Sequence, residues 1–185
     1  MRLKYSGLLS ISCATLALFA LCLPTSVTAQ APSLRANLLA DWTTQKDTLM
    51  KLAAAMPEAS FNYKPTAPQR SYGEQILHIA EANVIQMGRL VPTAAAPSVN
   101  MKATSKAEIL KALETSFDYG IAALEEQTDV TMLQLAETTR FDRFMGASTR
   151  ARVVSYVMGH TWDIYGQMVV YVRLNGITPP ASQRP

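Results

Sequence analysis

The sequence contains very little cysteine and histidine. Its two cysteines, Cys13 and Cys22, both lie near the N-terminus, so the chain beyond Ala29 has no thiol that could form a disulfide, bind a metal or attack a substrate. No serine stands in the G-x-S-x-G pattern of a nucleophile elbow either. These absences exclude a cysteine nucleophile beyond Ala29 and leave the catalytic residues of any activity unassigned.

An excess of charge of one sign is also lacking. The formal net charge is +3 at pH 7, and Arg2 and Lys4 near the N-terminus supply two of these charges, which leaves about +1 for the rest. A protein that binds nucleic acid needs a basic footprint for the phosphate backbone. The sequence therefore predicts no nucleic-acid partner.

The first 29 residues differ from the rest of the chain. Two basic residues precede an apolar run over residues 8–23, and Val27 and Ala29 suit the positions before a signal-peptidase cut. We predict a signal peptide over residues 1–29 and one exported domain over residues 30–185, periplasmic or secreted. An uncleaved anchor is the alternative, but the apolar run is short for a membrane span. After cleavage we expect no contact with a membrane.

The remaining sequence predicts four helices. Apolar residues recur at helical spacing over about residues 32–55, 71–90, 105–127 and 148–175. Beyond the last of these, Gly176 and a double proline form a typical helix stop. We therefore expect an all-α fold, a four-helix bundle.

Capping signals support two of the helix starts, and one connection is irregular. Ser71 with Glu74, and Ser105 with Glu108, have the spacing of a capping box. Residues 128–147 show no clear period, and short extended pieces around Leu133 or Phe141 are compatible with their composition. The bundle is thus expected to have an irregular connection before its last helix.

The two histidines fall on different kinds of helix face. At 100° per residue, one face of the last helix is expected to point into the bundle. It comprises Val153, Tyr156, Val157, His160, Ile164, Gln167, Met168, Tyr171 and Leu174. His78 projects opposite the main apolar stripe of the second helix, towards an adjoining groove, a subunit contact or solvent. Periodicity alone does not bring His78 and His160 together.

The other side of the last helix is also apolar. Met158, Trp162 and Val169 lie there, with Gly159 and Gly166 among them. A helix that is apolar on both sides is covered on both sides. Two interpretations are open, a homodimer contact or close packing within the monomer.

Each histidine is followed three residues later by a carboxylate, in the segments HIAE and HTWD. This spacing places Glu81 beside His78 and Asp163 beside His160 on neighbouring helical turns. Two such pairs could supply ligands to one divalent ion in a bundle. The alternative is that both histidines are hydrogen-bonded residues of the core or its boundary.

Two longer segments resemble the DinB/YfiT-like superfamily of metal-binding four-helix bundles. MPEASFNYKPTAPQRSYGEQILHIAEAN is similar to the connection into the family's second helix, and GHTWDIYGQMVVYVRLNGITPPAS to its last helix and tail. The resemblance covers about residues 38–182. It implies one divalent ion, zinc, nickel or iron, held by three histidines. His78 and His160 match two of them, and Ile164 occupies the third position, so Glu81 or Asp163 would have to complete the set.

The resemblance also implies a class of chemistry. Members of the superfamily include enzymes in which the metal activates a thiol or a water for transferase, isomerase or hydrolase reactions on small molecules. We expect either a metal-dependent enzyme of this kind or a non-catalytic bundle with a degenerate metal site. The non-catalytic bundle would bind a small apolar ligand or a protein partner in a pocket lined by Ile164 and Met168.

Overall fold

The computed structural model describes residues 33–140 and 142–183. The predicted signal peptide lies outside the described residues. Within the described part, no helix combines the length and the apolar composition that a membrane crossing requires.

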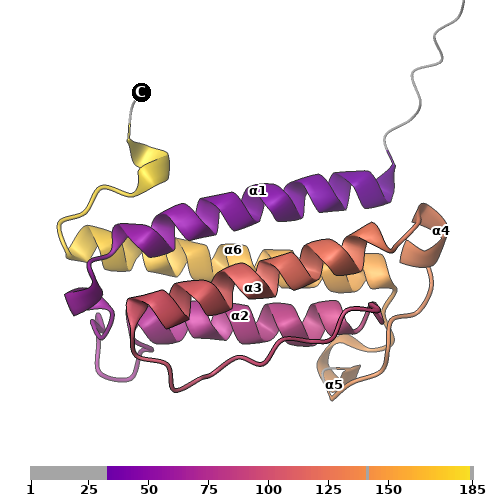
Figure 1. The fold of residues 1–185 in the computed structure, drawn as a ribbon, viewed down its shortest axis with the longest axis horizontal. Helices are drawn as coiled ribbons and strands as arrows, with labels where there is room; N and C mark the ends of the chain where they lie inside the picture. Colours follow the sequence, from indigo (N-terminus) through magenta and orange to yellow (C-terminus); the bar gives the residue numbers. More distant parts are fainter. Residues whose placement is uncertain (1–32, 141, 184–185) are drawn as a thin grey trace, which may run out of the picture. The chain divides into compact units, whose positions relative to one another are not determined.

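Four long helices form the domain. They are α1 (Leu34–Ala55), α2 (Tyr72–Gly88), α3 (Lys106–Glu125) and α6 (Arg150–Leu174), and they run side by side along the long axis (Figure 1). The contacts join α1 to α3, α3 to α2, α2 to α6 and α6 to α1. Each long helix therefore has two neighbours, with α2 diagonal to α1, and the predicted all-α bundle is confirmed.

Side-chain caps start the helices close to the predicted residues. At α2, Ser71 Oγ accepts from Glu74 N and the Glu74 carboxylate accepts from Ser71 N, which is the predicted capping box. At α3 the box is incomplete, because the Glu108 carboxylate accepts from the Ser105 hydroxyl rather than from the backbone. The N-terminus of α1 is capped from a distance, since Asp129 accepts from the backbone N–H groups of its first two residues.

The connection before α6 contains two single helical turns, α4 (Asp129–Met132) and α5 (Asp142–Met145). Leu133 itself closes α4 in helical conformation, and the short extended piece expected around it lies two residues later, at Leu135; Phe141 lies outside the described residues. A single antiparallel bridge joins Leu135 to Thr149. Short 3-10 turns, η1 (Glu58–Ser60) and η2 (Pro180–Ser182), follow α1 and α6.

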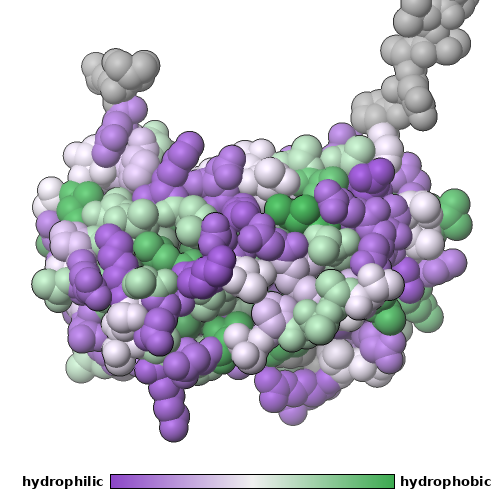
Figure 2. Space-filling view, in the orientation of Figure 1, coloured by the Kyte–Doolittle hydropathy of each residue, from purple (hydrophilic) through white to green (hydrophobic). Residues whose placement is uncertain are grey.

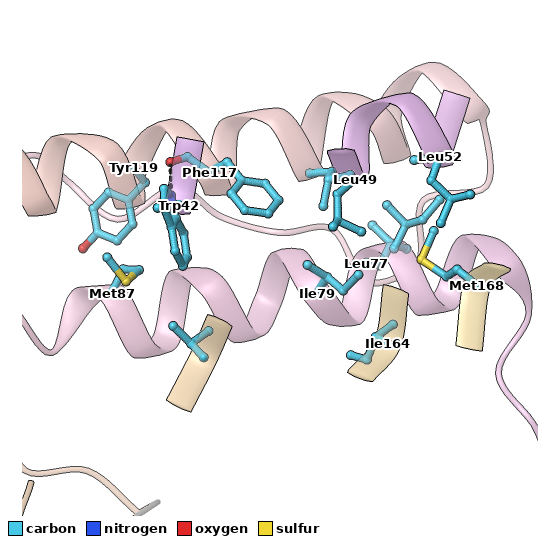
Figure 3. Close-up of a cluster of buried hydrophobic side chains, with 14 of the residues drawn as sticks. Trp42, Leu49, Leu52, Leu77, Ile79, Met87, Phe117, Tyr119, Ile164 and Met168 are labelled. Carbon is cyan, nitrogen blue, oxygen red and sulfur yellow. Dashed lines mark hydrogen bonds between the residues drawn. The ribbon is translucent and has the colours of Figure 1, made fainter. Parts of the chain in front are cut away.

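The core runs the length of the bundle. Its largest fully buried side chain is Trp42, whose indole N–H donates to the Phe117 carbonyl at 3.0 Å (Figure 3). Ile164 and Met168 enter this core from α6, beside the α2 residue Leu77 (Figure 3). Burial of such side chains against all four helices is the main source of the bundle's stability.

The buried stripe of α6 is turned relative to the predicted one. Thr161 is fully buried, whereas Tyr156 is 47% and Leu174 is 58% exposed and His160 is half-buried. In this orientation Thr161 Oγ1 donates to Oδ1 of the buried Asn83 of α2, at 3.4 Å. His160 therefore lies at the edge of the stripe rather than at its centre.

In the described part of the chain the outer side of α6 is open at its two glycines, whereas Met158 and Val169 are half-buried against the core. A Cβ atom added at Gly159 or Gly166 would meet no heavy atom within 4 Å, so the close packing within the monomer is wrong at these positions. Trp162 is 39% exposed on the same side. The homodimer contact stays a prediction.

On the face drawn in Figure 2, hydrophilic residues predominate, with small hydrophobic patches between them.

Candidate functional site

His78 and His160 meet in the groove between α2 and α6. Their ring centroids are 5.1 Å apart, with the planes at 87°, in an edge-to-face arrangement. Periodicity alone did not bring the two histidines together, whereas the family resemblance implied a shared site, and the adjoining groove foreseen for His78 is correct. Periodicity failed because it locates a residue relative to its own helix and carries no information on where the next helix packs.

Polar contacts between the two helices fix this register. Gln75 of α2 donates through Nε2 to Gln167 Oε1 of α6 at 2.9 Å, on one side of the histidine pair. On the other side, the Asn83–Thr161 hydrogen bond joins the same helices. Because both contacts are wholly or partly shielded from water, sliding or rotating α6 would break them at an appreciable free-energy cost. The two imidazoles are thus held together by the fold.

Burial holds the pKa of both imidazoles below the value of a free histidine. Burial lowers the pKa of His78 from 6.5 to about 4, and the charges of Arg70 and His160 act in the same direction. Burial also lowers the pKa of His160, which the Asp163 carboxylate partly opposes. Neither ring is hydrogen-bonded to another residue in the described part of the chain. Neutral imidazoles with unengaged nitrogens are the form that binds metal ions.

A pocket of about 210 Å³ opens beside the two histidines. It is lined by His78, Glu81, Ala82, Ile85, Gln86, Arg140, Tyr156, Val157 and His160. Arg140 was not predicted as a site residue, because it lies in an irregular segment without periodicity, and Tyr156 was predicted in the core. No sequence signal indicated Arg140. The exposed position of Tyr156 follows from the rotation of α6.

The two candidate carboxylates differ in position. Glu81 is half-buried and lines the pocket with His78. Asp163 is exposed, is not part of the pocket wall, and accepts a hydrogen bond of 3.0 Å from Gln167 Nε2. Glu81 therefore shares the pocket wall with the histidines, whereas Asp163 acts on His160 through its charge from outside that wall.

Ile164 is a core residue in this structure. Its side chain is 2% exposed, and neither Ile164 nor Met168 is part of the pocket wall. The expected apolar pocket lined by these two residues is therefore wrong: the apolar part of the observed wall comes from Ala82, Ile85 and Val157. Both residues instead fill the space between α6 and the rest of the bundle (Figure 3).

The separation of the two histidine rings is compatible with a shared metal ion. Two imidazoles on one tetrahedral ion, with metal–nitrogen bonds of about 2.0–2.1 Å, have ring centroids about 5 Å apart, and the observed separation is 5.1 Å. No three histidine, cysteine or acidic side chains among the described residues are grouped to hold a metal, so Glu81 would have to turn towards the pair. Two histidines and a glutamate are an established ligand set for catalytic zinc.

Comparison with known proteins identifies the fold independently of this site. A crystal structure of a DinB-like protein from Bacillus cereus has 19% sequence identity and a TM-score of 0.67, and the match covers 77% of this chain and 93% of that one. A DinB-like protein from Bacillus subtilis has 18% identity and a TM-score of 0.61, over 80% and 99% of the respective chains. No curated protein matches the chain.

These identities are low enough that the likeness shows the fold alone, and the family assignment comes from the sequence itself. The sequence model of the DinB family matches residues 26–185. This range covers most of the chain and includes every residue of the pocket. The protein belongs to the DinB family.

Proposed function

We propose that this DinB-family protein binds one divalent metal ion, zinc, nickel or iron, at the His78–His160 end of the pocket. Glu81 completes the ligand set, and a small molecule occupies the remainder of the pocket. The observation that carries the proposal is the pairing of two neutral imidazoles, 5.1 Å apart, in the wall of a pocket that also contains a carboxylate.

The chain's own residues have separable tasks in this proposal. His78 and His160 coordinate the ion through ring nitrogens. The Asn83–Thr161 hydrogen bond joins the two helices that carry them. The apolar wall around Val157 excludes water from part of the pocket, which strengthens electrostatic interactions there. A divalent ion bound at this position would lower the pKa of a water or thiol, the chemistry of metal-dependent hydrolases and transferases.

A second function is favoured by a specific observation. Because no three potential ligands are grouped in the described part of the chain, the pocket is also suited to a non-catalytic role without metal. In that case a small apolar ligand contacts Ala82, Ile85 and Val157, and the histidines are boundary residues of the pocket. The metal content of the purified protein distinguishes the two functions, because only the first requires a bound ion.

The protein purified without an affinity tag is expected to contain close to one equivalent of zinc, nickel or iron by elemental analysis. His160→Ala should lose it, because removal of a direct ligand weakens binding by more than the roughly 10–100-fold seen for outer-shell groups. Tyr156→Phe is the matched control, since it changes the same pocket wall without removing a ligand. Absence of metal from the wild type, even after incubation with zinc or nickel, would favour the non-catalytic function.

The identity of the third ligand is tested by two isosteric changes. Glu81→Gln is expected to weaken zinc binding by more than roughly tenfold, because a neutral amide oxygen replaces a charged direct ligand. Asp163→Asn should change the affinity less than twofold, since Asp163 is exposed and engaged by Gln167. The zinc affinities of the two variants are measured by competition with a chelator. A larger loss of affinity in Asp163→Asn than in Glu81→Gln would assign the third ligand to Asp163.

A further inference from the structure

The four most exposed large hydrophobic side chains of the described residues all lie between α3 and α6. They are Val130, Leu133, Leu135 and Phe144, with exposed fractions between 67% and 73%. Single exposed apolar residues are normal on a protein surface, whereas several that gather in one region mark a site of interaction. Their concentration in residues 130–144 therefore indicates a contact outside the bundle.

The segments that carry these side chains have core residues of their own. In α4, Met132 is fully buried, while Val130 and Leu133 are three residues apart and both exposed. Leu135 belongs to the short bridge to α6, and its neighbour Ala136 packs against the core. Because neighbouring side chains of an extended segment point to opposite sides, Leu135 points outwards. The exposed side chains are thus additional to those that fold the connection.

The chain enters the bundle beside these residues. Ser33 Oγ donates to Asp129 of α4 at 2.6 Å, and Asp129 also caps the first N–H groups of α1. Figure 1 accordingly shows α4 at the start of α1, with α5 close to the same end of the bundle. Residues 24–32 separate Ser33 from the apolar run of the predicted signal peptide. A segment of this length spans at most about 30 Å, so α4 stays near the membrane surface while that run is inserted.

The charges around the exposed side chains favour an anionic surface. Residues 128–149 contain three acidic residues, of which Asp129 caps α1 and Asp142 pairs with Arg89. Glu137 is the third. Against its single negative charge stand the four arginines of residues 140–152. This end of the bundle therefore has an excess of positive charge beside its exposed apolar side chains.

Arg143 and Phe144 are suited to the boundary between lipid headgroups and acyl chains. Phe144 has the most exposed large hydrophobic side chain of the described residues, and the Arg143 guanidinium lies 4.6 Å from the centre of its ring. At a membrane surface, aromatic and aliphatic side chains enter the apolar layer, and a neighbouring arginine keeps its charge at the level of the phosphates. A protein partner would provide no such layered surroundings by necessity, so we commit to a lipid surface.

We propose that this end of the bundle binds the surface of an anionic lipid membrane. Phe144 and Leu133 enter the headgroup region, and Arg143 contacts lipid phosphates. The proposal is independent of the proposed function, because none of these three residues lines the pocket. It departs from the expectation that the exported domain has no contact with a membrane after cleavage. That expectation took no account of which side chains the fold exposes.

Co-sedimentation with lipid vesicles tests the proposal on protein that begins at Gln30 and contains every helix of the bundle. One set of vesicles is phosphatidylcholine alone, and the other also contains phosphatidylglycerol. Binding to the anionic vesicles is expected to be at least about tenfold tighter, because each basic residue near an anionic surface adds to the attraction. Added salt should weaken this binding, since it screens exposed charges.

Variants of the exposed side chains identify the surface. Leu133→Ser combined with Phe144→Ser should lower the vesicle partition coefficient at least about tenfold, because both apolar side chains leave the lipid. Leu174→Ser is the matched control, since Leu174 is 58% exposed at the other end of α6. It should leave binding unchanged. Arg143→Gln should weaken binding to the anionic vesicles about fivefold and leave binding to phosphatidylcholine unchanged.

Three results would overturn the proposal: no binding to either kind of vesicle, equal binding to both, or full binding by the Leu133→Ser/Phe144→Ser protein. A loss in Leu174→Ser as large as in the double variant would also contradict it. Far-ultraviolet circular dichroism shows whether each variant keeps its helices. Sedimentation equilibrium of the same proteins tests the other occupant. A dimer that the double variant loses, without any vesicle binding, would assign the surface to a second copy of the chain.

Discussion

Replacing Asp142 by alanine is expected to lower the free energy of unfolding by about 3 kcal/mol, because it leaves a buried guanidinium without its counter-charge. The Arg89 side chain is 1% exposed and that of Asp142 is 18% exposed, and the two form an ion pair. Asp142 also accepts a hydrogen bond from the backbone N–H of Thr139 at 3.0 Å. Urea denaturation followed by circular dichroism measures the loss.

A double variant separates the charge from the packing. Arg89→Met combined with Asp142→Ala should recover much of the stability lost in Asp142→Ala, because a neutral side chain of similar length needs no counter-charge. The recovery is expected to be incomplete, since Arg89 also donates to Gln86 and to the backbone at Glu137.

An exposed ion pair provides the control. Lys111 and Glu114 are 72% and 41% exposed, so Glu114→Ala should leave the denaturation midpoint unchanged. If Asp142→Ala also left the denaturation midpoint unchanged, the ion pair with Asp142 would not stabilise Arg89 in the folded state.

The course of the helices could be predicted from the sequence because its determinants are local. Apolar periodicity and caps such as Ser71 lie within a few residues of the boundaries that they set. The cap on α1 could not be predicted, because its acceptor, Asp129, is 95 residues from Leu34 in the chain. The short helical turns of the irregular connection likewise depend on distant partners, of which Arg89 is the clearest.

The site was predictable only in its parts. The resemblance to the DinB/YfiT-like superfamily indicated His78 and His160, and their spacing to acidic residues indicated Glu81. Their meeting depends on the packing of α6 against α2, which a hydrogen bond between Asn83 and Thr161 helps to set. Arg140 reaches the pocket only through this tertiary structure, so no pattern in the sequence could reveal it.

Gly120→Ala is expected to destabilise the fold by about 3 kcal/mol, because the added methyl group has no space. A Cβ atom at position 120 would overlap Cζ2 of Trp42 and would lie 2.7 Å from its Nε1. The indole is fully buried and donates to the Phe117 carbonyl (Figure 3), so a shift that relieves the overlap also strains this hydrogen bond. Overpacking of a core typically costs about 1–3 kcal/mol, and loss of a buried hydrogen bond adds to it.

The same substitution at an exposed glycine should have the opposite sign. Gly166 lies in the interior of α6 with nothing near its Cβ position, so Gly166→Ala should stabilise the protein by roughly 0.5–1 kcal/mol through helix propensity. Urea denaturation of both variants tests the pair, and near-ultraviolet circular dichroism reports on Trp42. Equal effects at the two positions would contradict the close approach of α1 and α3. Since glycine is disfavoured inside a helix, its presence at position 120 is explained by this contact with the indole.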